Sequence, residues 1–215
     1  MQAIVQTVLQ KMGTLSQPQL KVMTTLLMTI LVLCGKVNFT HLSRYSPLSE
    51  KTDRRFFAKV FNFCRFNQVL IEQHVPSSHA LLAVMDASFN PKSGQKTFGL
   101  DWFYNGYRSR VERGLEASLI AVVDCVTHAS YALNVQQTYD QQQNPLLTRT
   151  DYALIQLSLT RKYLAERVRY LAVDAAYATY PFITEAVEMH LHVIRKLRQN
   201  ANLRYSYTGK QKSRG

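Results

Sequence analysis

Two aspartates stand at the ends of two short apolar segments that lie far apart in the chain. Leu81–Met85 leads into Asp86. Tyr170–Val173 leads into Asp174. A short apolar run predicts a buried strand, and an unpaired charge is costly to bury, so each acid should emerge at a strand end. Carboxylates from two strands of one sheet can hold Mg²⁺ or Mn²⁺, which prefer oxygen ligands. The pattern therefore predicts a divalent-metal site built on these two acids.

A strand-end aspartate taken alone is more often a cap or a turn residue than a metal ligand. The matching contexts of Asp86 and Asp174, in a basic protein, favour the metal site. Asp101 and Asp124 are weaker candidates, because Asp124 begins a predicted hairpin turn, where Asp is common for local hydrogen bonding. The histidines show no spacing typical of metal ligands.

The charge balance indicates a polyanionic partner. The 215 residues carry a formal charge of +12, and no acid occurs after Glu188 although seven Lys and Arg residues do. Clustered positive charge favours nucleic acid over the alternative of a generally basic cytosolic protein. The apolar run Leu26–Cys34 is shorter than the ~20 residues that a membrane span needs, so we expect no membrane contact and a prokaryotic cytoplasmic, nucleoid-associated location.

The cysteine spacing predicts neither disulfide bonds nor a zinc site. Cys34, Cys64 and Cys125 are scattered and form no CxxC pair, which argues against a disulfide framework or a zinc site. We expect each to be a small core residue.

Four helices are expected before residue 75, the predicted end of an N-terminal unit. Their ranges are 1 to about 17, Gln17–Cys34, Thr40–Tyr45, and Ser49 or Glu50 to about Phe63. The last should present an apolar face of Phe56, Phe57, Val60, Phe61 and Cys64. A short helix, a turn and a basic helix carrying Arg54 and Arg55 is the layout of a helix-turn-helix DNA reader. An ordinary helical bundle with a solvated basic face fits the spacing at least as well.

The second domain, residues 76–215, follows a predicted linker at Val75–Ala80. The segment after Asp86 interleaves aromatic residues with cations, which suits a surface that grips a nucleic-acid backbone and stacks on unpaired bases. A twisted hairpin with aromatic cross-strand pairs is the alternative. The predicted DNA-contacting residues of this domain are Lys92, Lys96, Arg108, Arg110, Arg195 and Arg198.

The expected element order of the second domain is three strands, a helix, a strand, a helix and a strand. The strands are the one at Leu81, Leu115–Val126, Tyr131–Tyr139, the one before Asp174, and His192–Arg198; the helices are Thr150–Arg167 and Pro181–His190. This order predicts an α/β (α+β) chain in which a helical unit precedes a ribonuclease H-like mixed sheet with flanking helices. In that fold the first and fourth strands are neighbours, which would place the two acids side by side.

The chain resembles insertion-sequence transposases of the DDE superfamily that have an IS4-type catalytic domain. The matching segments, which span about residues 76 to 215, are DASFNPKSGQKTFGLDWFYNG, the AVVD strand, YLAVDAAYA and HVIRKLRQNANL. The resemblance implies DNA transposition, with metal-dependent cleavage at transposon ends and joining to target DNA. It implies two Mg²⁺ or Mn²⁺ ions, with Asp86 bridging both and Asp174 binding one, and it allows a homodimer in a synaptic complex.

The third acid of that family, a glutamate on a later helix, has no counterpart in this chain. Glu185 and Glu188 lie too near Asp174 to replace it, so the chain resembles an N-terminal fragment of such an enzyme. We therefore expect DNA binding with weak or no cleavage by this chain alone. Two alternatives are a catalytically inactive DNA-binding remnant or repressor, and a ribonuclease H-like nuclease outside transposition; the helical basic N-terminal unit does not fit the latter.

Overall fold

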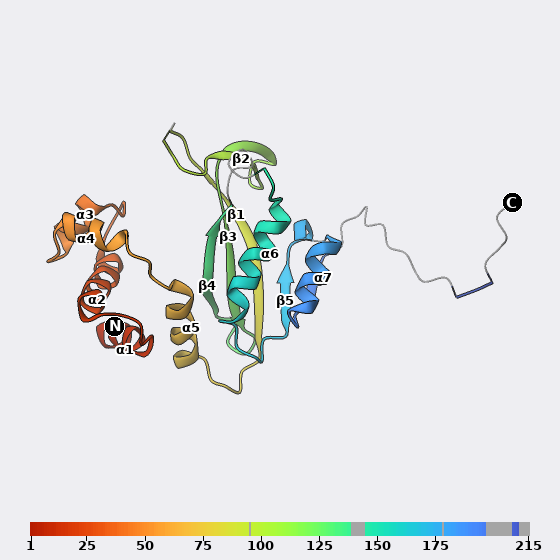
Figure 1. The fold of residues 1–215 in the computed structure, drawn as a ribbon, viewed down its shortest axis with the longest axis horizontal. Coiled ribbons are helices and arrows are strands. Elements are labelled where there is room, and N and C mark those ends of the chain that lie inside the picture. Colours follow the sequence, from red (N-terminus) through yellow and green to blue (C-terminus); the bar gives the residue numbers. More distant parts are fainter. Residues whose placement is uncertain (95, 139–144, 178, 197–207, 211–215) are drawn as a thin grey trace.

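The computed structural model describes residues 1–94, 96–138, 145–177, 179–196 and 208–210. Four N-terminal helices form one unit, and a mixed sheet with further helices forms the rest (Figure 1). The helices are α1 (Gln2–Lys11), α2 (Gln17–Val32), α3 (Phe39–Tyr45), α4 (Glu50–Phe57), α5 (Phe63–His74), α6 (Arg149–Arg161) and α7 (Tyr180–Glu188). The predicted α/β class is confirmed.

The N-terminal unit has a small apolar core of its own. Val5, Leu9 and Met12 of α1 pack against Met23 of α2. The first of these helices ends at Lys11, earlier than predicted, and Gly13 follows with a φ of +70°, which glycine adopts at little cost. The start of α2 was predicted correctly, since Ser16 and Gln19 form a capping box there.

The apolar surface of α2 is less enclosed than its composition predicted. Leu31 and Val32 at its C-terminal end are more than half exposed, and Cys34 is exposed beyond it. The prediction that every cysteine is a core residue was therefore wrong for Cys34 and also for the exposed Cys125; Cys64 is partly buried.

The helix predicted from residue 50 to about Phe63 is two helices. The first, α4, ends at Phe57, and α5 begins at Phe63 with the Asn62 side chain accepting a hydrogen bond from the Arg65 amide. A capping asparagine satisfies an amide that a continuous helix would otherwise bond, so it starts a new helix here. Phe57 and Val60, assigned to the apolar face, are exposed instead.

One six-stranded sheet forms the centre of the second part. The strands are β1 (Leu81–Pro91), β2 (Asp101–Asn105), β3 (Arg110–Asp124), β4 (Ser130–Gln137), β5 (Tyr170–Val173) and β6 (His192–Arg195). The order is β2-β3-β1-β5-β6, and β4 also pairs with β3. The pairs β1–β3, β2–β3 and β3–β4 are antiparallel, whereas β1–β5 and β5–β6 are parallel. Antiparallel strands followed by helical crossovers match the predicted order, except that β2 adds a strand between the first two that were predicted.

The core lies between one face of this sheet and the helices α6 and α7, which cross it in Figure 1. Met85 and Leu171 of the sheet pack with Leu157 of α6 and Phe182 of α7, and all four are fully buried. On the opposite face Leu119 and Val135 are exposed. The covered face accounts for the apolar alternation along the strands.

Helix α5 packs along β4 and joins the same core. Ile71 and Val75 are buried in that core, and Asn67 Nδ2 donates a hydrogen bond to the Leu133 carbonyl at 3.1 Å. The proposed domain boundary at residue 75 stays a prediction. Among the described residues no helix is both long enough and apolar enough to traverse a bilayer.

Candidate functional site

Asp86 and Asp174 lie at the same level of two neighbouring parallel strands. The expectation that each acid ends a strand was wrong for Asp86, because β1 continues to Pro91 and Asp86 is still paired with Leu119 of β3, whereas β5 ends at Val173. Met85 of β1 and Val173 of β5 are register partners, and each is followed by its aspartate. Adjacent strands lie about 4.8 Å apart, so the two acids begin from backbone positions about that distance apart. Met85 and Val173 are buried, while both aspartates are exposed. Strand alternation turns these acids away from the core.

Both carboxylates are anchored by a local hydrogen bond and lack a cationic partner. Asp86 Oδ1 accepts from the Ala87 amide at 2.9 Å, and Asp174 Oδ1 accepts from the Ala175 amide. Within the described part of the chain, neither acid forms an ion pair with a Lys, Arg or His. Two neighbouring negative charges with no counter-charge attract a cation.

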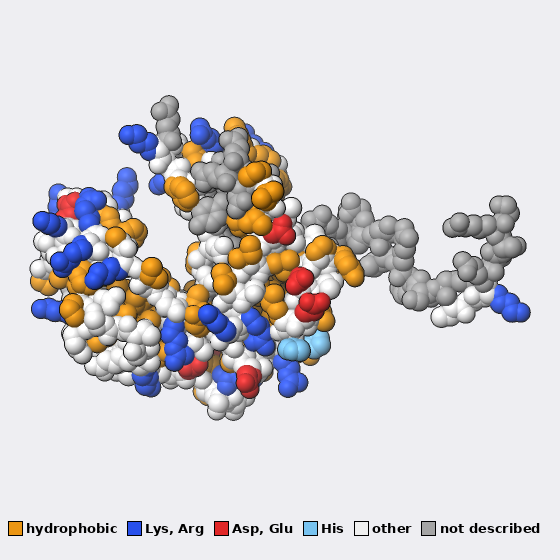
Figure 2. Space-filling view, viewed as in Figure 1, with side chains coloured by type: hydrophobic (Ala, Val, Ile, Leu, Met, Phe, Trp, Pro, Cys, Tyr) orange, Lys and Arg blue, Asp and Glu red, His pale blue; other side chains and the backbone are white. Residues whose placement is uncertain are grey.

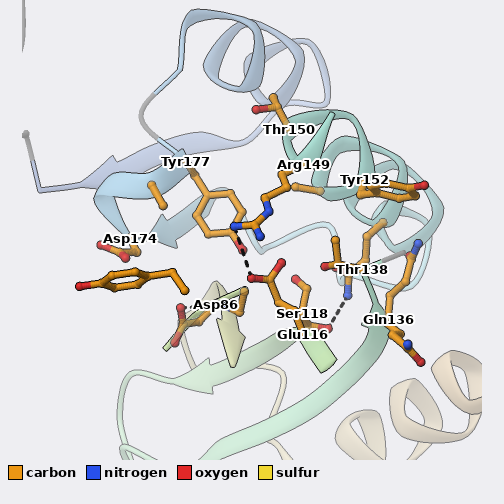
Figure 3. A pocket seen from close by; sticks show the side chains of 16 residues that line it. Asp86, Glu116, Ser118, Gln136, Thr138, Arg149, Thr150, Tyr152, Asp174 and Tyr177 are labelled. Carbon is orange, nitrogen blue, oxygen red and sulfur yellow. Dashed lines mark hydrogen bonds and ion pairs between the residues drawn. The ribbon is translucent and has the colours of Figure 1, made fainter. Parts of the chain in front are cut away.

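The two acids line one cavity of about 240 Å³ (Figure 3). Its walls come from β1, β3, β4, the N-terminal half of α6 and the short 3-10 helix Ala175–Tyr177. Gln156 supports the wall between α6 and β3, because its buried amide donates to the Ser118 carbonyl at 3.0 Å. The sheet and α6 thus form a rigid frame for the acids.

Tyr177 brings a hydroxyl into the same cavity. Burial raises the pKa of this phenol most strongly, an interaction with the Ser118 side chain lowers it in part, and the negative charges of Asp86, Glu116 and Asp174 raise it further. The hydroxyl therefore stays protonated at neutral pH and can donate a hydrogen bond inside the cavity.

Sequence reasoning missed two charged residues of the cavity, Glu116 and Arg149. Arg149 Nη1 lies 3.8 Å from Glu116 Oε2, as the dashed line in Figure 3 marks. The Arg149 guanidinium also lies over the Phe103 ring, 5.1 Å from its centroid, and donates to the Trp102 carbonyl at 3.4 Å. The strand alternation of Glu116 with Ser118 could have placed that acid in the cavity, whereas no sequence signal pairs it with an arginine from α6.

The donor atoms of the cavity suit one hard cation better than two. Asp86 and Asp174 bring two carboxylates to the same cavity, and Mg²⁺ commonly keeps several waters beside one or two carboxylates. Among the described residues no group of three potential metal ligands occurs, and Glu116 is already paired with Arg149. The residues present therefore fit a single, partly hydrated ion.

Four of the predicted DNA-contacting residues lie on or near the β2–β3 hairpin. Lys92, Arg108 and Arg110 line an open groove of about 660 Å³ beside Trp102. Lys96 is exposed but is not part of the groove lining. The alternative reading of this segment is correct in that it forms a hairpin, but Trp102 and Tyr104 of β2 pair with Arg113 and Val111 of β3 and not with other aromatic residues.

The other predicted DNA contacts differ in their surroundings. Arg54 is exposed on α4 and pairs with Glu50 at 2.6 Å, and Arg55 lies 5.2 Å from the centroid of the Phe56 ring. Arg195 is half-buried on β6. Arg198 lies outside the described residues. Basic side chains are scattered over the N-terminal helices and near the hairpin in Figure 2.

The weaker acid candidates do not enter the cavity. Asp124 is buried at the far end of β3, where its carboxylate accepts hydrogen bonds from Thr127 and the Val126 amide and lies 2.8 Å from His79 Nδ1. Asp101 begins β2 and is not part of the cavity lining. Their local roles agree with the turn reading of Asp124.

Comparison with known proteins yields only distant structural likeness. No protein-family model and no curated protein matches the chain. Among solved structures, a piggyBac transposase in a synaptic complex with hairpin DNA aligns over 94% of this chain with 15% identity and a TM-score of 0.42. The chain spans 41% of the length of that transposase. A likeness this weak is no evidence of a shared activity.

Proposed function

We propose that this protein is a metal-dependent enzyme of DNA phosphodiester chemistry, of the DDE transposase type, whose reaction centre is the Asp86–Asp174 pair. The observation that carries the proposal is the placement of two exposed carboxylates one residue beyond a register pair of neighbouring parallel strands, with no ion-pair partner among the described residues. The excess of positive charge supports a DNA substrate, cut at transposon ends and joined to target DNA.

The chain's own residues would bind and orient the reacting groups. Asp86 and Asp174 would hold Mg²⁺ or Mn²⁺. When bound, the metal would lower the pKa of an attacking water or 3′-hydroxyl and stabilise the leaving 3′-oxygen. The protonated Tyr177 hydroxyl can donate to a phosphate oxygen in the cavity, and Arg149 supplies positive charge at its wall.

Weak catalysis by this chain alone is part of the proposal. The family that the sequence resembles uses three acids, and the second metal ion of that enzyme would lack ligands here. Glu116 does not replace the third acid, because Arg149 neutralises it. Synapsis of two DNA ends by a homodimer fits the same class of enzyme.

Metal binding is testable without measuring activity. Terbium(III), a hard cation that prefers oxygen ligands, luminesces when a nearby tyrosine transfers energy to it, and Tyr177 lies in the cavity. Saturable tyrosine-sensitised luminescence is expected, with Mg²⁺ or Mn²⁺ competing. Asp86→Asn or Asp174→Asn should weaken terbium binding at least about tenfold, because each removes half of a two-carboxylate site.

Asp101→Asn is the matched control, since this acid lies outside the cavity. If all three variants bound terbium as tightly as the wild type, the proposed metal site at Asp86 and Asp174 would be wrong. Nicking of supercoiled plasmid in Mn²⁺ tests the chemistry, and little or none is expected from this chain. Robust nicking that Asp86→Ala abolishes would show that two acids suffice.

A DNA-binding protein without catalytic activity, such as a repressor, is the second candidate. The observation that favours it is the lack of a three-ligand cluster in the described part of the chain. Duplex DNA binding without saturable terbium or Mn²⁺ binding would select it.

A further inference from the structure

Trp102 is the chain's one tryptophan, and it lies on the outer face of the β2–β3 hairpin with 63% of its surface exposed. Its register partner across the hairpin is Arg113, and the next pair on the same face is Tyr104 with Val111. Opposed residues of an antiparallel pair share a face, so an indole, a guanidinium and a phenol lie side by side there. Phe103, between the two aromatics, faces the other way and is buried.

This face carries an excess of positive charge. The groove beside Trp102 is lined by Lys92, Arg108, Arg110 and Arg113, against one acid, Glu112. Arg108 and Arg110 pair with Glu112 at 3.1 and 2.6 Å. Within the described part of the chain, Lys92 and Arg113 form no ion pair. The groove therefore offers cations for phosphates beside an aromatic ring with its surface open.

We propose that this groove binds an unpaired DNA strand, with one base stacked on the Trp102 indole and the flanking phosphates held by Arg113 and Lys92. The proposal rests on DNA being the substrate of the proposed function, and it specifies the single-stranded form. Stacking on an exposed aromatic ring requires a free base face, which a paired and stacked duplex withholds. A protein partner would be a poorer match, since interface cores are depleted of charged residues.

The groove and the acid cavity are connected along the sheet. Tyr104 lines the cavity, and Trp102, two residues earlier on β2, lines the groove. On β1 the cavity is lined at Asp86 and the groove at Pro91, a separation of five residues or about 17 Å. A DNA strand that is unpaired near Asp86 and Asp174 could therefore stack a base on Trp102 a few nucleotides from the acids.

The intrinsic fluorescence of Trp102 reports on stacking directly, since no other tryptophan contributes. Three probes separate stacking from charge: a dT12 oligonucleotide, an abasic 12-mer of the same charge, and a 12-base-pair duplex. We expect dT12 to quench the fluorescence in a saturable way. The abasic strand should bind by charge without comparable quenching, and the duplex should quench less than dT12.

Affinity is measured separately by the anisotropy of labelled oligonucleotides. Trp102→Ala should weaken dT12 binding about five- to hundredfold, the range for one aromatic stack, and should leave abasic-strand binding nearly unchanged. Tyr107→Ala is the matched control, because this aromatic is 95% exposed at the hairpin turn and is not part of the groove lining. It should bind dT12 like the wild type, and circular dichroism checks that each variant is folded.

Equal quenching by the abasic strand and dT12, or unchanged dT12 affinity in Trp102→Ala, would overturn the stacking proposal. Terbium binding by the aspartate pair does not depend on Trp102, so such a result would leave the proposed function standing. If the wild type does not bind terbium but dT12 still quenches Trp102, the proposed enzyme is overturned and the single-strand site stands.

Discussion

Asp86 and Asp174 occupy equivalent positions on two parallel strands, one residue beyond the register pair Met85 and Val173. The hydrogen bonds that hold them come from the next amide in the chain, so each carboxylate keeps its second oxygen for another partner. If the pair holds a metal as proposed, mutual repulsion of the two charges should destabilise the metal-free fold, and metal binding should stabilise it.

Asp86→Asn should stabilise the metal-free protein while removing its response to metal. Loss of one of two neighbouring charges relieves roughly 0.5 kcal/mol, the scale of exposed charge pairs. In the wild type, Mg²⁺ at millimolar concentration should raise the melting temperature, because a ligand of the folded state stabilises it. Differential scanning fluorimetry with and without Mg²⁺ measures both effects. A metal-free variant that melts below the wild type would argue against repulsion at this site.

A histidine–aspartate pair lies beside the N-terminal end of β1. His79 Nδ1 lies 2.8 Å from Asp124 Oδ2, and the Thr127 hydroxyl and Val126 amide donate to the same carboxylate. Burial raises the pKa of Asp124, but the hydrogen bonds from His79, Val126 and Thr127 outweigh it, and the pKa lies far below the usual range. The folded state therefore favours the ionised carboxylate.

The contribution of ionised Asp124 should be visible in how the free energy of unfolding changes with pH. Because its folded-state pKa is lowered, its stabilising effect is complete above the unfolded pKa near 3.9 and is lost as pH falls below that value. Asp124→Asn should lower the melting temperature by several degrees at pH 7 and flatten the loss of stability below pH 4. Asp101→Asn, at the partly buried start of β2, is the control. Parallel pH profiles for Asp124→Asn and the wild type would show that the buried acid contributes nothing.

The order of strands and helices could be predicted from the sequence because short apolar runs, capping residues and turn residues are local signals. The apolar runs before Asp86 and Asp174 were both correctly predicted as strands, although β1 continues past Asp86 to Pro91. The break between α4 and α5 was missed, since the apolar residues around Val60 continue the helical spacing while Asn62 starts a new helix. The hairpin strand β2 was given only as an alternative, because its aromatic residues also suit a binding loop.

The composition of the cavity could be predicted only in part. Asp86 and Asp174 carry matching contexts, but Arg149 reaches Glu116 across 33 residues of sequence, and that contact depends on where α6 crosses the sheet. Tyr177 likewise enters the cavity because the chain turns through a 3-10 helix directly after Asp174. Contacts of this kind follow from tertiary packing rather than from local spacing.

Glu112 limits the positive charge of the hairpin groove, so its removal should tighten DNA binding. Hydrogen bonds from Asn105, Arg110 and Arg108 lower the pKa of Glu112 to about 2, so it is fully ionised at neutral pH. In Glu112→Gln, Arg108 and Arg110 become free to bind phosphate. The slope of log affinity for dT12 against log salt concentration should steepen by roughly 1, as for one added phosphate contact.

Glu185→Gln is the matched control for that measurement, because Glu185 is exposed on α7 and lies outside both the groove and the cavity. It changes the net charge equally but should leave the salt slope as in the wild type. Identical slopes for both variants would mean that the arginines paired with Glu112 do not contact DNA.

Arg149 should weaken metal binding at the acid pair, because it places a positive charge on the wall of the same cavity. Its guanidinium neutralises Glu116 and lies over Phe103. Arg149→Ala removes that charge and frees the Glu116 carboxylate, so terbium should bind roughly two- to fivefold more tightly, as expected for loss of about 0.5–1 kcal/mol of charge repulsion. The same change should cost about 1 kcal/mol of stability through lost contact with Phe103.

Arg149→Lys separates the two effects, because it keeps the charge and loses the planar contact with the ring. It should bind terbium like the wild type yet share part of the stability loss. Weaker terbium binding by Arg149→Ala would mean instead that Arg149 holds the cavity in shape, because its link between α6 and the β2–β3 hairpin would then matter more than its charge.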